Sequence, residues 1–118
     1  MYGLPNDFNA SRFIGYALEL VCFSQNQVCF HFNERVSIVV LNELLHQYSS
    51  DALPKTIRIP VVESDLMRLL GHSIVQASGN EKGTLAITFD SGDILQFLDD
   101  SAHYESYTIT FGDEEITV

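Results

Sequence analysis

Positively charged residues are scarce in this chain. Its 118 residues include 6 Lys and Arg against 16 Asp and Glu, which gives a formal net charge of −10 at pH 7. A surface of this sign repels the phosphate backbone of nucleic acids. The composition therefore argues against direct nucleic-acid binding and favours a basic partner.

Cysteine is also rare, since Cys22 and Cys29 are the only two in the chain. Two cysteines are too few for a disulfide scaffold, and they lack the paired Cys-x-x-Cys spacing of a zinc site. If residues 24–27 form a turn, Cys22 and Cys29 lie opposite each other, within the range of a disulfide. Reduced thiols that fill a sheet face are the simpler interpretation.

Long apolar runs are missing. No run approaches the 18 residues that a membrane-spanning helix needs, so no membrane partner is expected. Residues 1–7 lack the basic and apolar regions of a signal peptide. The expected location is the cytoplasm, where thiols stay reduced.

Catalytic motifs are missing as well. The sequence contains no glycine-rich nucleotide loop, phosphate-binding loop or nucleophile elbow, and its histidines show no metal-binding spacing. His103 lies two residues before Glu105, but one such pair does not make a mechanism. The acidic turns at 90–93 and 99–101 lack the oxygen pattern of a calcium loop. We therefore expect no enzymatic activity, no cofactor and no metal site.

The sequence does contain a clear pattern of period two, which is typical of β-strands. Polar turn residues, such as those at 90–93, separate the alternating segments. The expected strands cover residues 15–23, 28–33, 36–41, 56–59, 84–90, 94–98, 107–111 and 115–118.

Helices are expected to be short and few. Residues 63–71 carry a Ser N-cap, an early Asp and a terminal Gly, which predicts one helix. Residues 9–14 are long enough for a single turn. Residues 41–48 stay ambiguous, because apolar residues at helical spacing follow directly after an expected strand.

An internal similarity links the two halves of the chain. Residues 28–38 match residues 85–95, and an apolar-Gly step precedes each copy after a slip of one residue. We interpret the halves as two similar β-units, approximately residues 13–48 and 70–118, within a single domain of residues 1–118. Chance similarity between two hairpins is the alternative. If each unit offers an apolar face to the other, the fold is mainly β: an antiparallel two-layer β-sandwich with one or two short helices.

The negative charge is concentrated in the last third of the chain. Residues 81–118 contain nine acidic residues, with Lys82 as their one cation. One interpretation is a solvated acidic face that keeps the protein soluble. The other is a docking face for a basic partner, which electrostatic attraction would steer into place.

Residues 83–95 and 99–109 resemble a family of small bacterial proteins of about this length. The shared pattern is Gly-Thr-Leu-x-Leu-x-Phe, a turn with Gly, a strand, then Asp-x-Ser and Tyr-Glu-Ser-Tyr. The first half is similar to the same family at residues 13–15, 28–32 and 36–38, whereas residues 43–60 fall outside the resemblance.

The resemblance implies a β-rich fold and a role. Small acidic proteins of this kind are found among the immunity partners of secreted bacterial toxins, in systems of contact-dependent growth inhibition. The resemblance supplies no catalytic residue. Within its Tyr-Glu-Ser-Tyr motif, Tyr107 is expected in the core and Glu105 at the surface.

The leading hypothesis is therefore an immunity protein that binds a cognate toxin domain, basic and nuclease-like, such as a tRNase. It would neutralise the toxin by acidic occlusion, without turnover. The residues expected to bind this partner are Asp99, Asp100, Tyr104, Glu105, Asp113, Glu114 and Glu115. Reversing the charge of the last three should slow association and weaken its dependence on salt.

Two other classes of function remain open. A non-catalytic β-domain would self-associate, because a strand over residues 115–118 at a sheet edge invites pairing into a homodimer. A small hydrolase or ligand-binding sandwich would need a closed apolar pocket with convergent polar groups.

Overall fold

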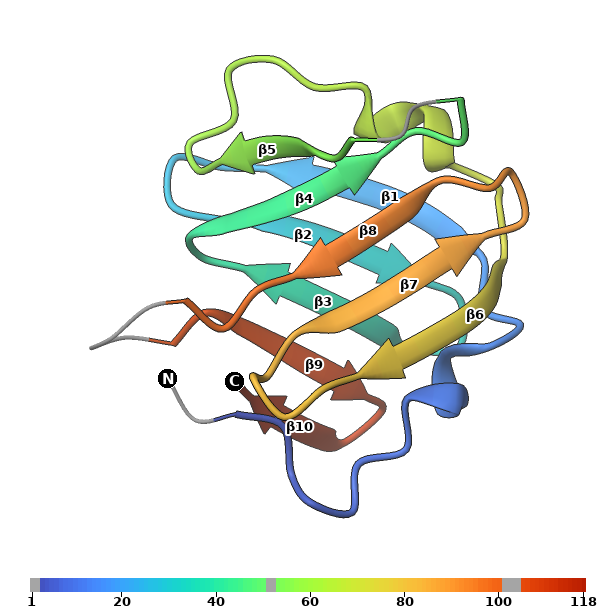
Figure 1. The fold of residues 1–118 in the computed structure, drawn as a ribbon, viewed down its shortest axis with the longest axis vertical. Helices are drawn as coiled ribbons and strands as arrows, with labels where there is room; N and C mark the ends of the chain where they lie inside the picture. Colours follow the sequence, from blue (N-terminus) through green and yellow to red (C-terminus); the bar gives the residue numbers. More distant parts are fainter. Residues whose placement is uncertain (1–2, 51–52, 101–104) are drawn as a thin grey trace.

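The computed structural model describes residues 3–50, 53–100 and 105–118. Two five-stranded antiparallel sheets pack face to face around one apolar core (Figure 1). One sheet has the strand order β1-β2-β3-β9-β10 and the other β5-β4-β8-β7-β6. The predicted class, a mainly-β antiparallel two-layer sandwich, is confirmed.

The alternation of apolar and polar residues places the strands. The first sheet contains β1 (Leu18–Phe23), β2 (Val28–Phe32), β3 (Val36–Val40), β9 (Tyr107–Phe111) and β10 (Glu114–Thr117). The second contains β4 (Glu43–Gln47), β5 (Lys55–Arg58), β6 (Ile74–Gly79), β7 (Leu85–Phe89) and β8 (Ile94–Phe97). Strand β7 shows the rule: Leu85, Ile87 and Phe89 are buried, whereas the residues between them are half-buried.

One predicted local feature is confirmed, one ambiguous segment is settled and one prediction is corrected. Cys22 and Cys29 are direct partners in the β1–β2 register, and both are free thiols. The ambiguous segment 41–48 forms a strand, β4. The helix predicted over residues 63–71 is wrong in its length, because only the 3-10 helix η2 (Leu66–Leu69) forms there. Its N-cap is Asp65, which makes no side-chain capping bond. The segment takes the tighter 3-10 form, whose runs seldom exceed about four residues, and Gly71 follows with a φ of +83°.

The two halves of the chain follow one order of elements, a 3-10 helix and then five strands. The helix η1 (Ala10–Phe13) and strand β1 precede η2 and β6 by 56 residues, whereas β2 precedes β7 by 57. The turn between β1 and β2 is one residue shorter than the turn between β6 and β7. This difference accounts for the slip of one residue in the sequence match.

Hydrogen bonds between the halves are reciprocal. The Gly15 N–H donates to the Ile74 carbonyl, and the equivalent Gly71 N–H donates to the Leu18 carbonyl, both at 2.8 Å. Between them Ala17 forms an antiparallel bridge to its own equivalent, Ser73. Equivalent residues that face each other mark the position of an approximate two-fold axis.

Each half contributes its last hairpin to the sheet of the other half. Strand β4 pairs with β8, and β9 pairs with β3, so the hairpins β4–β5 and β9–β10 cross between the sheets. The core fills the space between the sheets: the rings of Phe30 and Phe97 meet edge-on with centroids 5.6 Å apart. Tyr107 is fully buried, as predicted for the core.

Candidate partner-binding site

Three predicted partner-binding residues lie at one end of the sandwich, beside the turn between β3 and β4. Asp99 and Asp100 follow β8, and Glu105 precedes β9. The Asn42 side-chain amide donates to Oδ1 of Asp100 at 3.1 Å, which joins this segment to the start of β4. Glu43, the first residue of β4, completes the group. We call Glu43, Asp99, Asp100 and Glu105 the acidic end.

Asp99 is held in a fixed position. The Gly3 N–H donates to Oδ2 of Asp99 at 2.9 Å, and the Ser106 hydroxyl donates to Oδ1 at 3.2 Å. The neighbouring Gly83, at a φ of +83°, leaves room for this carboxylate, since a Cβ there would lie 2.7 Å from Oδ2. The buried Tyr107 hydroxyl donates to the Gly83 carbonyl at 2.6 Å and fixes that loop.

Two carboxyl groups of the acidic end interact directly. A hydrogen bond with Asp100, helped by partial burial, raises the pKa of Glu43. The Arg58 Nε atom donates to Glu43 at 3.1 Å and opposes the shift, but the pKa remains above its ordinary value. When both are ionised, the two carboxylates carry two negative charges against the single positive charge of Arg58.

The other predicted residues lie elsewhere. Strand β9 separates Asp113 and Glu114 from the acidic end, a distance of about 17 Å along its 5 extended residues. Each is bonded to an arginine: Arg35 lies 3.0 Å from Asp113, and Arg12 lies 2.9 Å from Glu114. Glu115 is exposed on β10 and Tyr104 lies outside the described residues. The six described residues fall into two groups, one before and one after strand β9.

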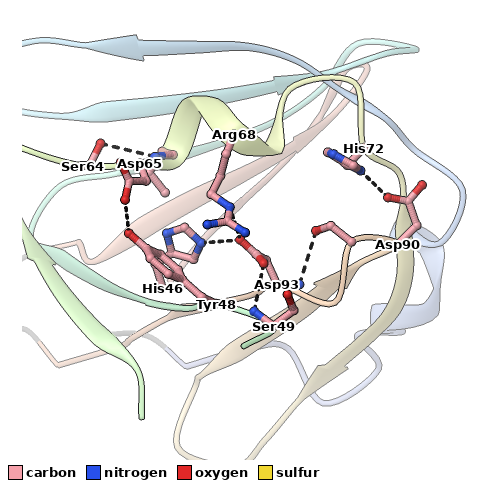
Figure 2. Close-up of polar contacts among 11 residues, drawn as sticks. His46, Tyr48, Ser49, Ser64, Asp65, Arg68, His72, Asp90 and Asp93 are labelled. Carbon is pink, nitrogen blue, oxygen red and sulfur yellow. Dashed lines mark hydrogen bonds and ion pairs between the residues drawn. The ribbon is translucent and has the colours of Figure 1, made fainter. Parts of the chain in front are cut away.

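A second polar cluster, which the sequence did not indicate, is buried between β4, β8 and η2 (Figure 2). Nε2 of His46 lies 2.9 Å from Oδ2 of Asp93, and both side chains are fully buried. The Arg68 Nε atom lies 3.2 Å from the same oxygen, and the Ser49 N–H donates to the other at 3.0 Å. These hydrogen bonds outweigh the cost of burial and lower the pKa of Asp93.

Tyr48 covers this cluster from the side of η2. Its ring meets that of His46 at a centroid distance of 4.5 Å, and the Arg68 guanidinium lies 4.7 Å from its centroid. The Tyr48 hydroxyl donates to Asp65, and this bond raises the pKa of the phenol. The cluster thus joins η2 to the second sheet through charge-assisted hydrogen bonds.

A histidine bonded to a carboxylate is the pairing that general bases use, and the chain contains two such pairs among its described residues. His46 is shut away from solvent, and its Nδ1 atom has no hydrogen-bond partner among the described residues. Five surface hollows in the described part of the chain are lined by neither His46 nor Asp93. The His72–Asp90 pair, at 2.6 Å, is half-exposed and lies in a turn. The geometry of both pairs supports a structural role.

Within residues 3–50, 53–100 and 105–118, no group of three or more His, Cys, Asp or Glu side chains is arranged to hold a metal ion. No helix in the same ranges is long and apolar enough to cross a membrane. Comparison with protein-family models, with curated proteins and with solved structures found no match.

Proposed function

We propose that this chain is an immunity protein that binds a basic, nuclease-like toxin domain and neutralises it by occlusion, with the acidic end as the main contact. The observation that carries the proposal is the fixed carboxylate of Asp99, next to Asp100, which Asn42 holds at the start of β4 beside Glu43. Carboxylates held together without enough cations gain from a lysine or arginine brought by a partner.

The acidic composition of the sequence also supports a basic, nuclease-like partner. A nuclease needs a cationic surface to hold the phosphate backbone, and an anionic inhibitor imitates that backbone. Attraction between the two surfaces raises the association rate, and the bound inhibitor then blocks access to the substrate. Resemblance to the immunity partners of contact-dependent inhibition toxins supports this class of partner.

We assign different roles to the predicted residues from their exposure and their existing ion pairs. Asp100 and Glu105 are exposed and could meet a partner, whereas Asp99 keeps the loop in place. Asp113 and Glu114 are already bonded to arginines, so they and Glu115 contribute to long-range attraction more than to close contacts.

The test is affinity capture of the tagged protein from its native cells, with washes at low and then high salt. Mass spectrometry is expected to identify a basic domain in near-equal amount. The double variant Asp100→Asn with Glu105→Gln should reduce its recovery by at least tenfold, which corresponds to about 1.4 kcal/mol.

The matched control removes the same charge elsewhere. Asp7→Asn with Glu81→Gln neutralises two exposed carboxylates outside the acidic end. This control is expected to retain the partner. Equal loss in both double variants would show that only net charge matters, and capture of no basic domain would contradict the proposal.

A further inference from the structure

The approximate two-fold symmetry of the chain provides an internal comparison between two equivalent sides of the sandwich. On one side, residues 59–65 connect β5 to η2, next to β1 (Figure 1). On the other, residues 3–9 precede η1, next to β6 and β10. Both segments end at the N-cap of a 3-10 helix, Asp65 in one case and Asn9 in the other.

Each side carries a matching pair of hollows. Phe23, Val61, Val62 and Ser64 contribute to one hollow, and their equivalents 56 residues away, Gly79, Pro5, Asn6 and Phe8, contribute to its counterpart. A second hollow borders the edge strand β5, and its counterpart borders the edge strand β10. The two sides therefore share one backbone arrangement but carry different side chains.

The side next to β1 is apolar and exposed. Phe23 is 45% exposed, Met67 53% and Val62 97%. Their equivalents in the other half are Gly79, Ser11 and Asn6. Since small or polar residues serve the fold at those positions, folding does not require apolar residues at Phe23, Val62 and Met67. We call these three residues the apolar side patch.

The two sides also differ in what covers them. Leu4 lies over Gly79, where its Cδ1 atom is 2.7 Å from the position of an added Cβ, and Phe8 packs nearby. The residues equivalent to Leu4 and Phe8 are Pro60 and Ser64, which are too short to cover Phe23 in the same way. The chain thus leaves Phe23 without the cover that it supplies on the equivalent side.

Charged residues beside the patch favour a second copy as the missing cover. Arg58 and Glu63 line the same hollow as Val62. The Arg58 side chain is 81% exposed, and its Nε donates to Glu43. In a two-fold interface residue i meets j and j meets i, so a contact between Arg58 of one copy and Glu63 of the other would form twice. This arrangement offsets the repulsion between two acidic chains at the contact.

We propose that the apolar side patch is a homodimer interface, in which Val62 and Met67 of one copy cover Phe23 of the other. The acidic end shares no residue with this patch, and it adjoins the proposed interface at Arg58, whose Nε donates to Glu43. The dimer does not depend on the proposed immunity function, because it rests on the comparison between the two halves.

Sedimentation velocity on the full chain tests the proposal. A species of twice the 13.3 kDa chain mass should appear between about 1 and 500 µM, the range in which weak homodimers assemble. The variants Val62→Asn and Met67→Ser introduce the residues of the equivalent positions, Asn6 and Ser11. Each should weaken the dimer at least tenfold and leave the melting temperature nearly unchanged, because both side chains are exposed.

Ile14→Asn is the matched control. Ile14 is 50% exposed, outside the patch, and its equivalent Leu70 is also apolar. This variant should dimerise like the wild type. A wild-type protein that stays monomeric throughout, or a dimer that Val62→Asn and Met67→Ser leave intact, would overturn the proposal. A monomer whose captured basic domain is lost in these variants would assign the patch to that partner instead.

Discussion

His46 and Asp93 form a fully buried pair, with 2.9 Å between Nε2 and Oδ2, although 47 residues separate them in the sequence. His46 lies on β4 of the first half, and Asp93 directly precedes β8 of the second half. The pair therefore fastens the exchanged hairpin β4–β5 to the sheet that receives it. Arg68 extends the connection to η2.

Replacing Asp93 should destabilise the fold strongly. Asp93→Asn removes the charge that His46, Arg68 and the Ser49 N–H all contact, and it leaves buried polar atoms without a full set of partners. The expected loss is about 2–4 kcal/mol of unfolding free energy. Urea denaturation followed by circular dichroism measures it.

Asp90→Asn is the control for this change. Asp90 also bonds a histidine, His72, but both side chains are about half-exposed. Exposed ion pairs contribute about 0–1 kcal/mol, so the loss should be small. Similar losses in the two variants would show that burial does not set the contribution of Asp93.

The stability that Asp93 contributes should depend on pH in the acid range. Burial raises its pKa, but the bonds from His46 and Ser49 lower it more, so the folded pKa lies below the unfolded value of about 3.9. The contribution is present above about pH 4 and is lost as pH falls through the folded pKa. The difference in unfolding free energy between wild type and Asp93→Asn should therefore shrink from pH 6 to pH 3. A constant difference would contradict this account.

Substitutions at two glycines distinguish the cost of backbone strain from the cost of a steric clash. Gly71 and Gly83 both have a φ of +83°, but a Cβ at Gly71 meets nothing within 4 Å, whereas one at Gly83 meets the Asp99 side chain at 2.7 Å. Gly71→Ala should cost about 1–2 kcal/mol for its left-handed backbone. Gly83→Ala should cost more, because Asp99 must also move. Equal melting temperatures for the two variants would show that the Asp99 loop yields without cost.

The coupling between Glu43 and Asp100 is open to direct measurement. Asp100→Asn removes the main cause of the raised pKa of Glu43, so that pKa should fall. A carboxylate whose pKa is raised by folding destabilises the protein above that pKa, and the variant should therefore be slightly more stable at pH 7. NMR titration of the Glu43 carboxyl carbon gives the shift, with Asp7→Asn as control. An unchanged Glu43 pKa in Asp100→Asn would show that the two carboxyl groups do not interact.

Local pattern predicted much of the fold. Alternation set the face of each residue in β2 and β7, and the turn at 24–27 set the partnership of Cys22 with Cys29. These features depend on neighbours in the sequence, so one chain suffices to find them. The exchange of hairpins between the sheets could not be predicted from local pattern. The alternation within β4 does not specify whether this strand pairs with β3 or with β8.

The candidate site was predicted only in part. Charge density indicated the acidic residues, but no local signal shows that Asp113 pairs with Arg35 or that Glu43 meets Asp100. The first pair is 78 residues apart. Such contacts arise from strand order, which brings distant turns together at one end of a sheet. The His46–Asp93 pair was missed for the same reason.

The proposal that this chain neutralises a toxin is tested most directly by titrating the captured basic domain with the chain. That domain is purified and mixed with increasing amounts of this protein, and its cleavage of tRNA is followed by gel electrophoresis. An immunity protein that acts by occlusion should inhibit completely at one copy of the acidic chain per toxin domain. Undiminished cleavage at a large excess of the chain would contradict it.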